Sequence, residues 1–133
     1  MAKLLADSSA LLALVDRDDR HHARAREFLR EQPSLRFVVT ELIVAEVATR
    51  LRARADAERA VGLARSLLAG GRYEVIFVDA ELFSAALARM LQLRDKRLSL
   101  TDCASFELMD RLRLRAAFSF DRDFRDCGYP MLP

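Results

Sequence analysis

The stretch AAFSFDRDF, residues 116–124, joins an apolar strand to a polar tip, and it is the starting point for predicting the fold class. Four of its first five residues are apolar, as in a strand buried in a core, and Asp121 and Asp123 follow them. The segment KLLAD, residues 3–7, repeats this pattern near the start of the chain, where a short apolar run ends at Asp7. Both segments predict a buried strand that carries a carboxylate at its carboxyl end.

Between these two segments, strand-like and helix-like stretches alternate. Further strands are predicted at 35–39 and 73–78, with a short last strand at 129–132. Apolar residues spaced three or four apart, behind capping Ser, Thr or Asp, predict helices at 8–16, 21–32, 41–54, 57–69, 80–95 and 101–114. This alternation predicts an α/β fold: a three-layer α/β/α sandwich with a mostly parallel sheet of four to five strands. We see no repeat or linker, so residues 1–133 are expected to form a single domain.

Composition excludes several classes of protein. With 52% hydrophobic and 32% charged residues, the 133-residue chain is typical of a globular protein. No apolar run approaches the roughly 18 residues of a membrane helix, and Asp7 interrupts the one stretch that resembles a signal peptide. We therefore expect a cytoplasmic protein with no membrane partner. Two cysteines, Cys103 and Cys127, make no disulfide framework, and a net charge of +2 is too small to indicate nucleic-acid binding alone.

Four acidic residues stand out because of their surroundings. Ligands bind beyond the carboxyl ends of parallel strands, so Asp7 and Asp121 are expected to face one crevice. Glu46 lies at the edge of an apolar helix face, and Asp102 falls in the first turn of its predicted helix. Carboxylates that share a pocket repel one another, and a divalent cation removes that repulsion. Because the candidate ligands are all oxygens, Mg²⁺ or Mn²⁺ is the expected ion.

Each of these acids also has a purely structural interpretation. Asp7 is a favoured residue for capping the helix that follows it. Glu46 can form an ion pair with Arg50 one turn later. Asp102 is favoured by the dipole of its helix, and Asp121 is common in turns. Local sequence leaves these alternatives open.

Four segments taken together resemble a known family. ADSSALLALVDRDDRHHARA (6–25), VTELIVAEV (39–47), LSLTDCASFELM (98–109) and FSFDRDF (118–124) occur in the order and at the separations found in PIN domains. More narrowly, they resemble the VapC-type toxin ribonucleases of type II toxin–antitoxin pairs. The resemblance spans almost the whole chain, and no acid of the motif is missing.

The resemblance implies a PIN-like fold and roles for particular residues. The implied catalytic acids are Asp7, Glu46, Asp102 and Asp121, and the implied metal ligands among them are Asp7, Asp102 and Asp121. The resemblance also implies Asp123 as an additional acid of the same site, with loop capping as its structural alternative, and Ser9 and Ser119 as hydroxyls beside the site.

The resemblance also implies an activity and partners. Members of the family are Mg²⁺- or Mn²⁺-dependent endoribonucleases that leave a 5′ phosphate and a 3′ hydroxyl, usually act as homodimers, and are inhibited by a small antitoxin protein. A non-catalytic PIN-like module that binds RNA or protein is the alternative. A receiver-type signalling domain is disfavoured, because Lys96, the only late lysine, is predicted in a turn.

The pair His21–His22 is interpreted as surface residues at a helix start. Arg50 and Arg54 are interpreted as a solvated helix face that could also steer RNA.

Overall fold

A computed structural model describes residues 2–133 and contains one sheet of five parallel strands. The strands are β1 (Lys3–Ala6), β2 (Arg36–Thr40), β3 (Tyr73–Ile76), β4 (Ala117–Phe118) and β5 (Met131–Leu132). Their spatial order is β3-β2-β1-β4-β5, and every neighbouring pair is parallel. The predicted parallel α/β architecture is thus confirmed, with five strands.

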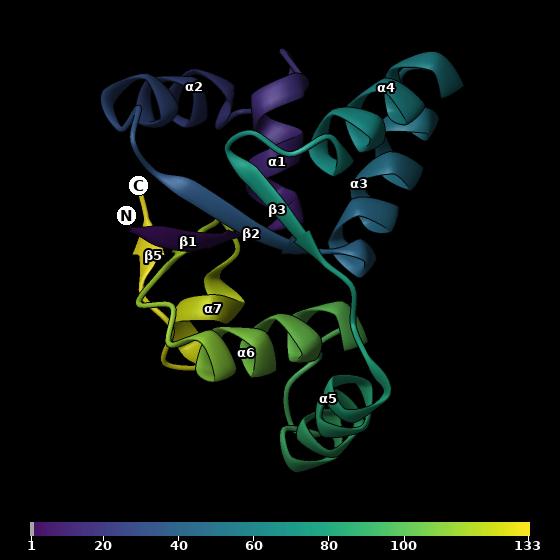
Figure 1. Ribbon diagram of the computed structural model, residues 1–133, viewed down its shortest axis with the longest axis vertical. Coiled ribbons are helices and arrows are strands. Elements are labelled where there is room, and N and C mark those ends of the chain that lie inside the picture. The colour runs from purple at the N-terminus through teal and green to yellow at the C-terminus, as the bar shows by residue number, and fades with distance from the viewer. Residues whose placement is uncertain (1) are drawn as a thin grey trace.

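Helices cover both faces of the sheet. They are α1 (Ser8–Val15), α2 (His22–Glu31), α3 (Glu41–Arg54), α4 (Ala57–Leu68), α5 (Ala80–Gln92), α6 (Leu100–Leu112) and α7 (Arg122–Asp126). Figure 1 shows α1 to α4 on one side of the sheet and α5 to α7 on the other, which gives the expected three layers. Among residues 2–133, no helix combines the length and apolar character needed to span a bilayer.

The direction of chain winding changes between β1 and β4. These strands are neighbours, with Ala6 opposite Phe118 in the register. After β1 the chain enters α1 on one face, and after β4 it enters α7 on the other face (Figure 1). Such a switch point leaves a crevice at the carboxyl ends of the two strands. Asp7 lies there, one residue beyond β1, and Asp121 lies three residues beyond β4.

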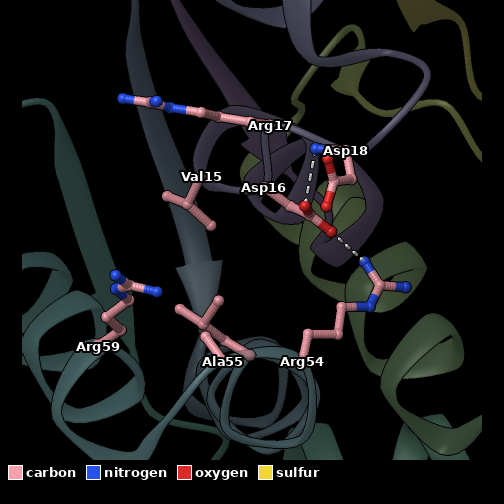
Figure 2. A pocket seen from close by; sticks show the side chains of 8 residues that line it. Val15, Asp16, Arg17, Asp18, Arg54, Ala55 and Arg59 are labelled. Carbon is pink, nitrogen blue, oxygen red and sulfur yellow. Dashed lines mark hydrogen bonds and ion pairs between the residues drawn. The ribbon is translucent and has the colours of Figure 1, made fainter.

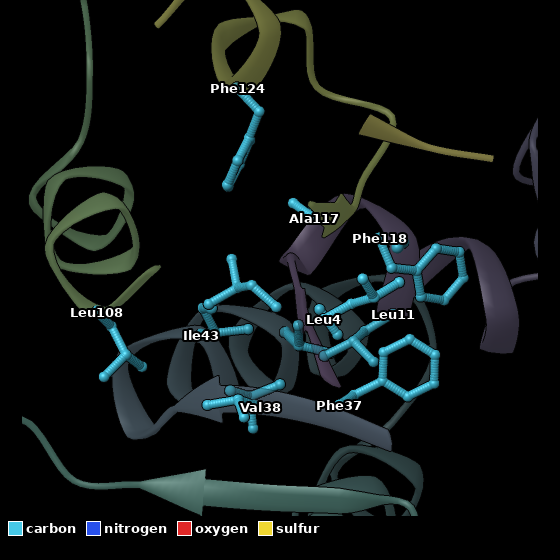
Figure 3. Packing of buried hydrophobic residues seen from close by; sticks show 14 of the residues in the cluster. Leu4, Leu11, Phe37, Val38, Ile43, Leu108, Ala117, Phe118 and Phe124 are labelled. Atoms are coloured by element: carbon cyan, nitrogen blue, oxygen red, sulfur yellow. The ribbon is translucent and has the colours of Figure 1, made fainter. Parts of the chain in front are cut away.

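The core explains why the central strands are apolar throughout. The ring of Phe118 lies 5.0 Å from that of Phe28 on α2 and 5.4 Å from that of Phe37 on β2. On the opposite face, Phe106 of α6 meets Phe124 of α7 edge to face at 5.0 Å. Figure 3 shows side chains from both layers converging on the sheet. This double-sided burial fixes the strands whose tips carry the acids.

Element ends depart from expectation at the switch point. The strand predicted at the start of the 116–124 stretch is paired only over β4, because the Phe120 N–H leaves the ladder and donates to Ser9 Oγ at 2.9 Å. Helix α6 starts one residue earlier than predicted and is capped by Ser99. The short helix α7 was not predicted, since five residues carry no visible periodicity.

Candidate functional site

Three carboxylates from two parts of the chain, α6 and α7, meet beside the switch point. Asp102 lies in the first turn of α6, Asp121 caps α7, and Asp123 lies in the first turn of α7. Each offers one oxygen, and these oxygens lie within 4.8 Å of one another. All three side chains are partly exposed. The group is therefore open to a ligand from solvent.

Asp7 is more buried than these three residues, and the hydrogen bonds from neighbouring side chains reach only one of its carboxylate oxygens. It caps α1, and 3% of its surface is exposed. Its Oδ2 accepts hydrogen bonds from Ser9 Oγ at 2.8 Å, Ser119 Oγ at 3.0 Å and the Ser9 N–H at 3.4 Å. The hydrogen bonds from Ser9 and Ser119 thus all go to this oxygen. Its Oδ1 remains available to another partner.

Asp102 and Asp121 repeat this one-sided pattern. Asp102 Oδ2 accepts from the Ser99 N–H, and Ser99 Oγ accepts from the Asp102 N–H, both at 3.1 Å, which forms a capping box. Asp121 Oδ1 accepts from the Asp123 N–H at 3.0 Å. In the described chain, the second oxygen of each carboxylate has no hydrogen bond. Local backbone structure thus aims one oxygen of each acid without using the other.

The site is electrostatically strained without a cation. Burial raises the pKa of Asp7, the Asp121 charge adds to this, and the Ser9 and Ser119 hydrogen bonds oppose it. Burial raises the pKa of Asp102 to about 6, helped by the charges of Asp7 and Asp121 and opposed by hydrogen bonds from Ser99. Burial and the Asp121 charge also raise the pKa of Asp123.

No basic residue within residues 2–133 forms an ion pair with these four aspartates. The mutual repulsion of the acids is therefore not relieved by an arginine or lysine in direct contact. The arrangement suits either bound protons or a hard cation.

Glu46 stands apart from the three close carboxylates. Its Oε1 accepts from Ser8 Oγ at 3.0 Å and lies 3.0 Å from Arg50 Nη2. The ion pair with Arg50, one alternative that the sequence left open, is therefore present. Because Ser8 directly follows Asp7, Glu46 still contacts the segment that carries the site, and one quarter of its side chain is exposed.

The structure brings together most of the residues singled out from the sequence. Ser9 and Ser119 both contact the Asp7 carboxylate, and Asp123 joins the group of close oxygens. Two supporting residues were missed, Ser8 on Glu46 and Ser99 on Asp102. The S-x-x-D spacing of 99–102 is a capping-box signal that could have revealed the second one.

Comparison with known proteins identifies relatives of this fold. The family model described as PIN domain matches residues 4–128. A search of curated protein sequences found no match. Among solved structures, the sarcin–ricin loop cleaving toxin VapC20 of Mycobacterium tuberculosis superposes with a TM-score of 0.88 at 24% identity, over 95% of each chain.

Two further structures share the fold at lower identity. VapBC2 from Rickettsia felis, bound to a DNA fragment from its promoter, gives a TM-score of 0.71 at 10% identity and covers 98% of this chain and 97% of its own. A toxin–antitoxin complex from Klebsiella pneumoniae gives 0.66 at 17% identity, covering 98% and 96%.

Proposed function

The chain belongs to the PIN domain family, and from this premise we propose that it is a metal-dependent endoribonuclease, the toxin of a toxin–antitoxin pair. One observation carries the proposal: three aspartates, Asp7, Asp102 and Asp121, each present one held and one free carboxylate oxygen at the switch point of a parallel sheet.

The donor set fits Mg²⁺ or Mn²⁺. Asp102, Asp121 and Asp123 supply carboxylate oxygens within 4.8 Å of one another, and Asp7, which is not among these close oxygens, adds a buried carboxylate at the end of the neighbouring strand. No sulfur or imidazole belongs to the group, which disfavours zinc. We propose Asp7, Asp102 and Asp121 as ligands, with Asp123 as the fourth acid. When bound, the ion supplies Lewis-acid activation of a water and of the phosphoryl oxygens.

The chain's own residues prepare this site. Ser9 and Ser119 fix the Asp7 carboxylate, so its orientation does not depend on the ion. The α6 capping box fixes Asp102, and the first turn of α7 fixes Asp121. Preorganised ligands lower the free-energy cost of assembling the site around a phosphodiester. We propose that Glu46 orients Ser8 and contributes negative charge to the same region.

The proposed activity is tested by incubating the purified protein with RNA in Mg²⁺, in Mn²⁺ and in excess EDTA. A sarcin–ricin loop hairpin is a suitable first substrate, because the similar VapC20 structure is described as a toxin that cleaves that loop. Total bacterial RNA serves as the unbiased substrate. We expect cleavage with either ion, none in EDTA, and fragments with a 5′ phosphate and a 3′ hydroxyl. Cleavage that persists in EDTA would remove the metal from the mechanism.

A protein partner and a second copy of the chain are part of the proposal. The Klebsiella pneumoniae structure is a toxin–antitoxin complex, which supports a small antitoxin for this chain as well. Large apolar side chains are exposed along α5, at Phe83, Leu87 and Leu91, and surfaces of this kind usually contact another protein. We propose an antitoxin and a homodimer acting in the cytoplasm. Light scattering of the purified protein, alone and with the product of a neighbouring gene, tests both.

A further inference from the structure

A hollow of about 260 Å³ lies beside the acidic site, between α1, α3 and the loop that precedes α2. Two aromatic rings, those of His21 and Phe120, line it and stack on each other. Their centroids are 4.2 Å apart and their planes differ by 3°. Both side chains are partly exposed. Two flat rings stacked at the edge of an open hollow form a platform for a third flat group.

The platform is held in place by its surroundings. The His21 N–H donates to Asp19 Oδ1 at 2.8 Å, and Arg20 Nε donates to His21 Nε2 at 3.1 Å. On the other ring, the Phe120 N–H donates to Ser9 Oγ, and the Phe120 ring meets that of Phe118 edge to face. The rings are therefore positioned before any ligand arrives, which lowers the entropy cost of binding.

The platform is joined directly to the carboxylates. Ser9 Oγ, which accepts from the Phe120 N–H, donates to Asp7 Oδ2 at 2.8 Å. Phe120 also sits in the chain between Ser119, which donates to Asp7, and Asp121. A group bound on the rings therefore lies next to whatever the carboxylates hold.

Positive charge surrounds the hollow. Arg20, Arg50 and Arg54 line it, with Asp19 as the acid among the lining residues. Arg50 and Arg54 each contact one carboxylate through a single nitrogen. A guanidinium has five N–H donors, so both retain donors for a phosphate.

The charge continues beyond the hollow. Arg54 also lines a second hollow, about 480 Å³ in volume, together with Arg17 and Arg59. Figure 2 shows Arg54 paired with Asp16 at one side of this space and the other two arginines around it. Asp16 and Asp18 also line this second hollow, so the surface beyond the platform is mixed in charge, with three arginines against two aspartates.

We propose that this hollow binds an unpaired RNA base next to the scissile phosphate, with the base stacked on the His21–Phe120 pair and its phosphate contacted by Arg50 and Arg54. The inference rests on the proposed ribonuclease function and adds a subsite to it. Aromatic platforms flanked by arginines bind single-stranded RNA because every base has a flat face and every nucleotide has a negative charge. Phe120 and His21 are positioning residues, since they hold the nucleotide and take no part in the chemistry.

The test uses the Asp102→Asn background, which the proposed function predicts to be inactive, in Mg²⁺. The probe is a set of single-stranded hexaribonucleotides that each carry one 2-aminopurine at a successive position. We expect binding to quench 2-aminopurine fluorescence at one or two adjacent positions only. Phe120→Leu removes that quench and raises Kd on the order of tenfold, whereas Phe120→Tyr keeps both.

Two variants guard against misinterpretation. His21→Ala removes the other ring and is expected to weaken the same quench, so the result does not depend on whether Phe120→Leu folds well. Phe77→Leu changes an aromatic residue that is 65% exposed and lines neither hollow, and it is expected to bind like the parent protein. In the otherwise wild-type enzyme, Phe120→Leu raises KM with little change in kcat.

The outcomes separate failure of the subsite from failure of the function. If the wild-type protein cleaves RNA but the quench is equal at all positions, or survives both ring substitutions, the subsite is wrong and the ribonuclease proposal stands. If the ring substitutions weaken binding of the antitoxin and leave RNA binding unchanged, the hollow is a protein-docking surface and the subsite is again wrong. If the wild-type protein neither binds nor cleaves RNA, both proposals fail.

Discussion

Two groups of acidic residues in this protein make opposite use of their carboxylates. Beside α5, Arg89 contacts Glu107 at 2.8 Å and Asp110 at 2.6 Å, and Tyr129 donates to the second oxygen of Asp110 at 2.8 Å. At the carboxyl ends of β1 and β4, by contrast, no basic residue of the described chain forms an ion pair with the sheet-edge group, which consists of Asp7, Asp102, Asp121 and Asp123.

The contrast separates a structural cluster from a prepared binding site. Burial lowers the pKa of Arg89, but the hydrogen bonds to Tyr129 and Asp110, together with the Glu107 charge, more than offset this and raise it above its ordinary value. The cluster of Arg89, Glu107 and Asp110 thus contains its own positive charge, the Arg89 guanidinium. The sheet-edge group has no basic partner within the described chain, and burial, with a smaller contribution from the neighbouring carboxylates, raises the pKa values of Asp7 and Asp102. A protein that needed these acids only for stability would be expected to pair them as it pairs Glu107.

The largest expected effect comes from removing one charge of the sheet-edge group. Asp102→Asn is predicted to reduce RNA cleavage about 100- to 1000-fold, because it removes a metal ligand while keeping the shape of the side chain. The matched control is Asp110→Asn, which changes an acid of the Arg89 cluster and is expected to leave kcat unchanged. Single-turnover cleavage measured for both variants, with circular dichroism as a check of folding, decides the issue. Equal activity in the two variants would show that Asp102 contributes no more to cleavage than an acid of the Arg89 cluster does.

The Arg89 cluster is expected to show the reverse behaviour. Arg89→Met leaves Glu107 and Asp110 without their cation and is predicted to lower the free energy of unfolding by about 2 kcal/mol, with cleavage intact where the variant is folded. Arg111→Met is the control, because its 3.7 Å pair with Asp79 is exposed and is expected to contribute less than about 0.5 kcal/mol. Urea unfolding of both variants tests the difference, and similar midpoints would show that Arg89 is not a structural centre.

The sequence predicts one of these regions far better than the other. Asp7 and Asp121 follow apolar strands, and parallel strands align their carboxyl ends, so their meeting can be anticipated from pattern alone. Asp102 needs the family resemblance, because the sequence predicts its place in the first turn of a helix but not which strand ends that helix start lies beside. The Arg89 cluster has no local signature, since it joins residues of α5, α6 and the segment before β5.

Finer features of the site lie beyond sequence patterns. Helix α7 is a single turn, too short for hydrophobic periodicity, and it is what brings Asp123 to Asp102. The stacking of His21 on Phe120 joins residues 99 positions apart, and the sequence offered only a surface interpretation for His21. Which carboxylate oxygen is held depends on single hydrogen bonds, which no residue pattern encodes.

Glu46 shares features of both groups of acidic residues. It has an arginine partner, like Glu107, but it also contacts Ser8 beside Asp7. If it serves the site, Glu46→Gln keeps the contact with Ser8, removes the charge, and lowers kcat roughly tenfold. If it serves only the ion pair, stability changes by less than about 0.5 kcal/mol, because Arg50 is half exposed, and kcat stays the same. Arg50→Gln, which breaks the pair and spares the acid, is the matching variant for kinetics.

The smallest effect concerns pH. Burial, together with the charges of Asp7 and Asp121, raises the pKa of Asp102 from 3.8 to about 6 in the folded protein. An acid with a raised folded pKa stabilises the fold most when protonated, so this contribution is complete below pH 4 and is lost as pH rises through about 6. In EDTA, we expect the wild-type protein to lose on the order of 1 kcal/mol over this range relative to Asp102→Asn, after allowing for partial exposure of the side chain.

Thermal unfolding of both proteins in EDTA between pH 4 and 7 measures this difference. His21 and His22 are present in both proteins, so they do not contribute to the difference in stability between them. Adding Mg²⁺ at pH 7 should restore the lost stability in the wild-type protein and have little effect on Asp102→Asn, because a cation that binds only the folded state shifts the equilibrium toward it. Parallel pH profiles for the two proteins would mean that neither burial nor the neighbouring carboxylates raise the pKa of Asp102. The sheet-edge group would then differ from the Arg89 cluster only in having no basic partner within the described chain.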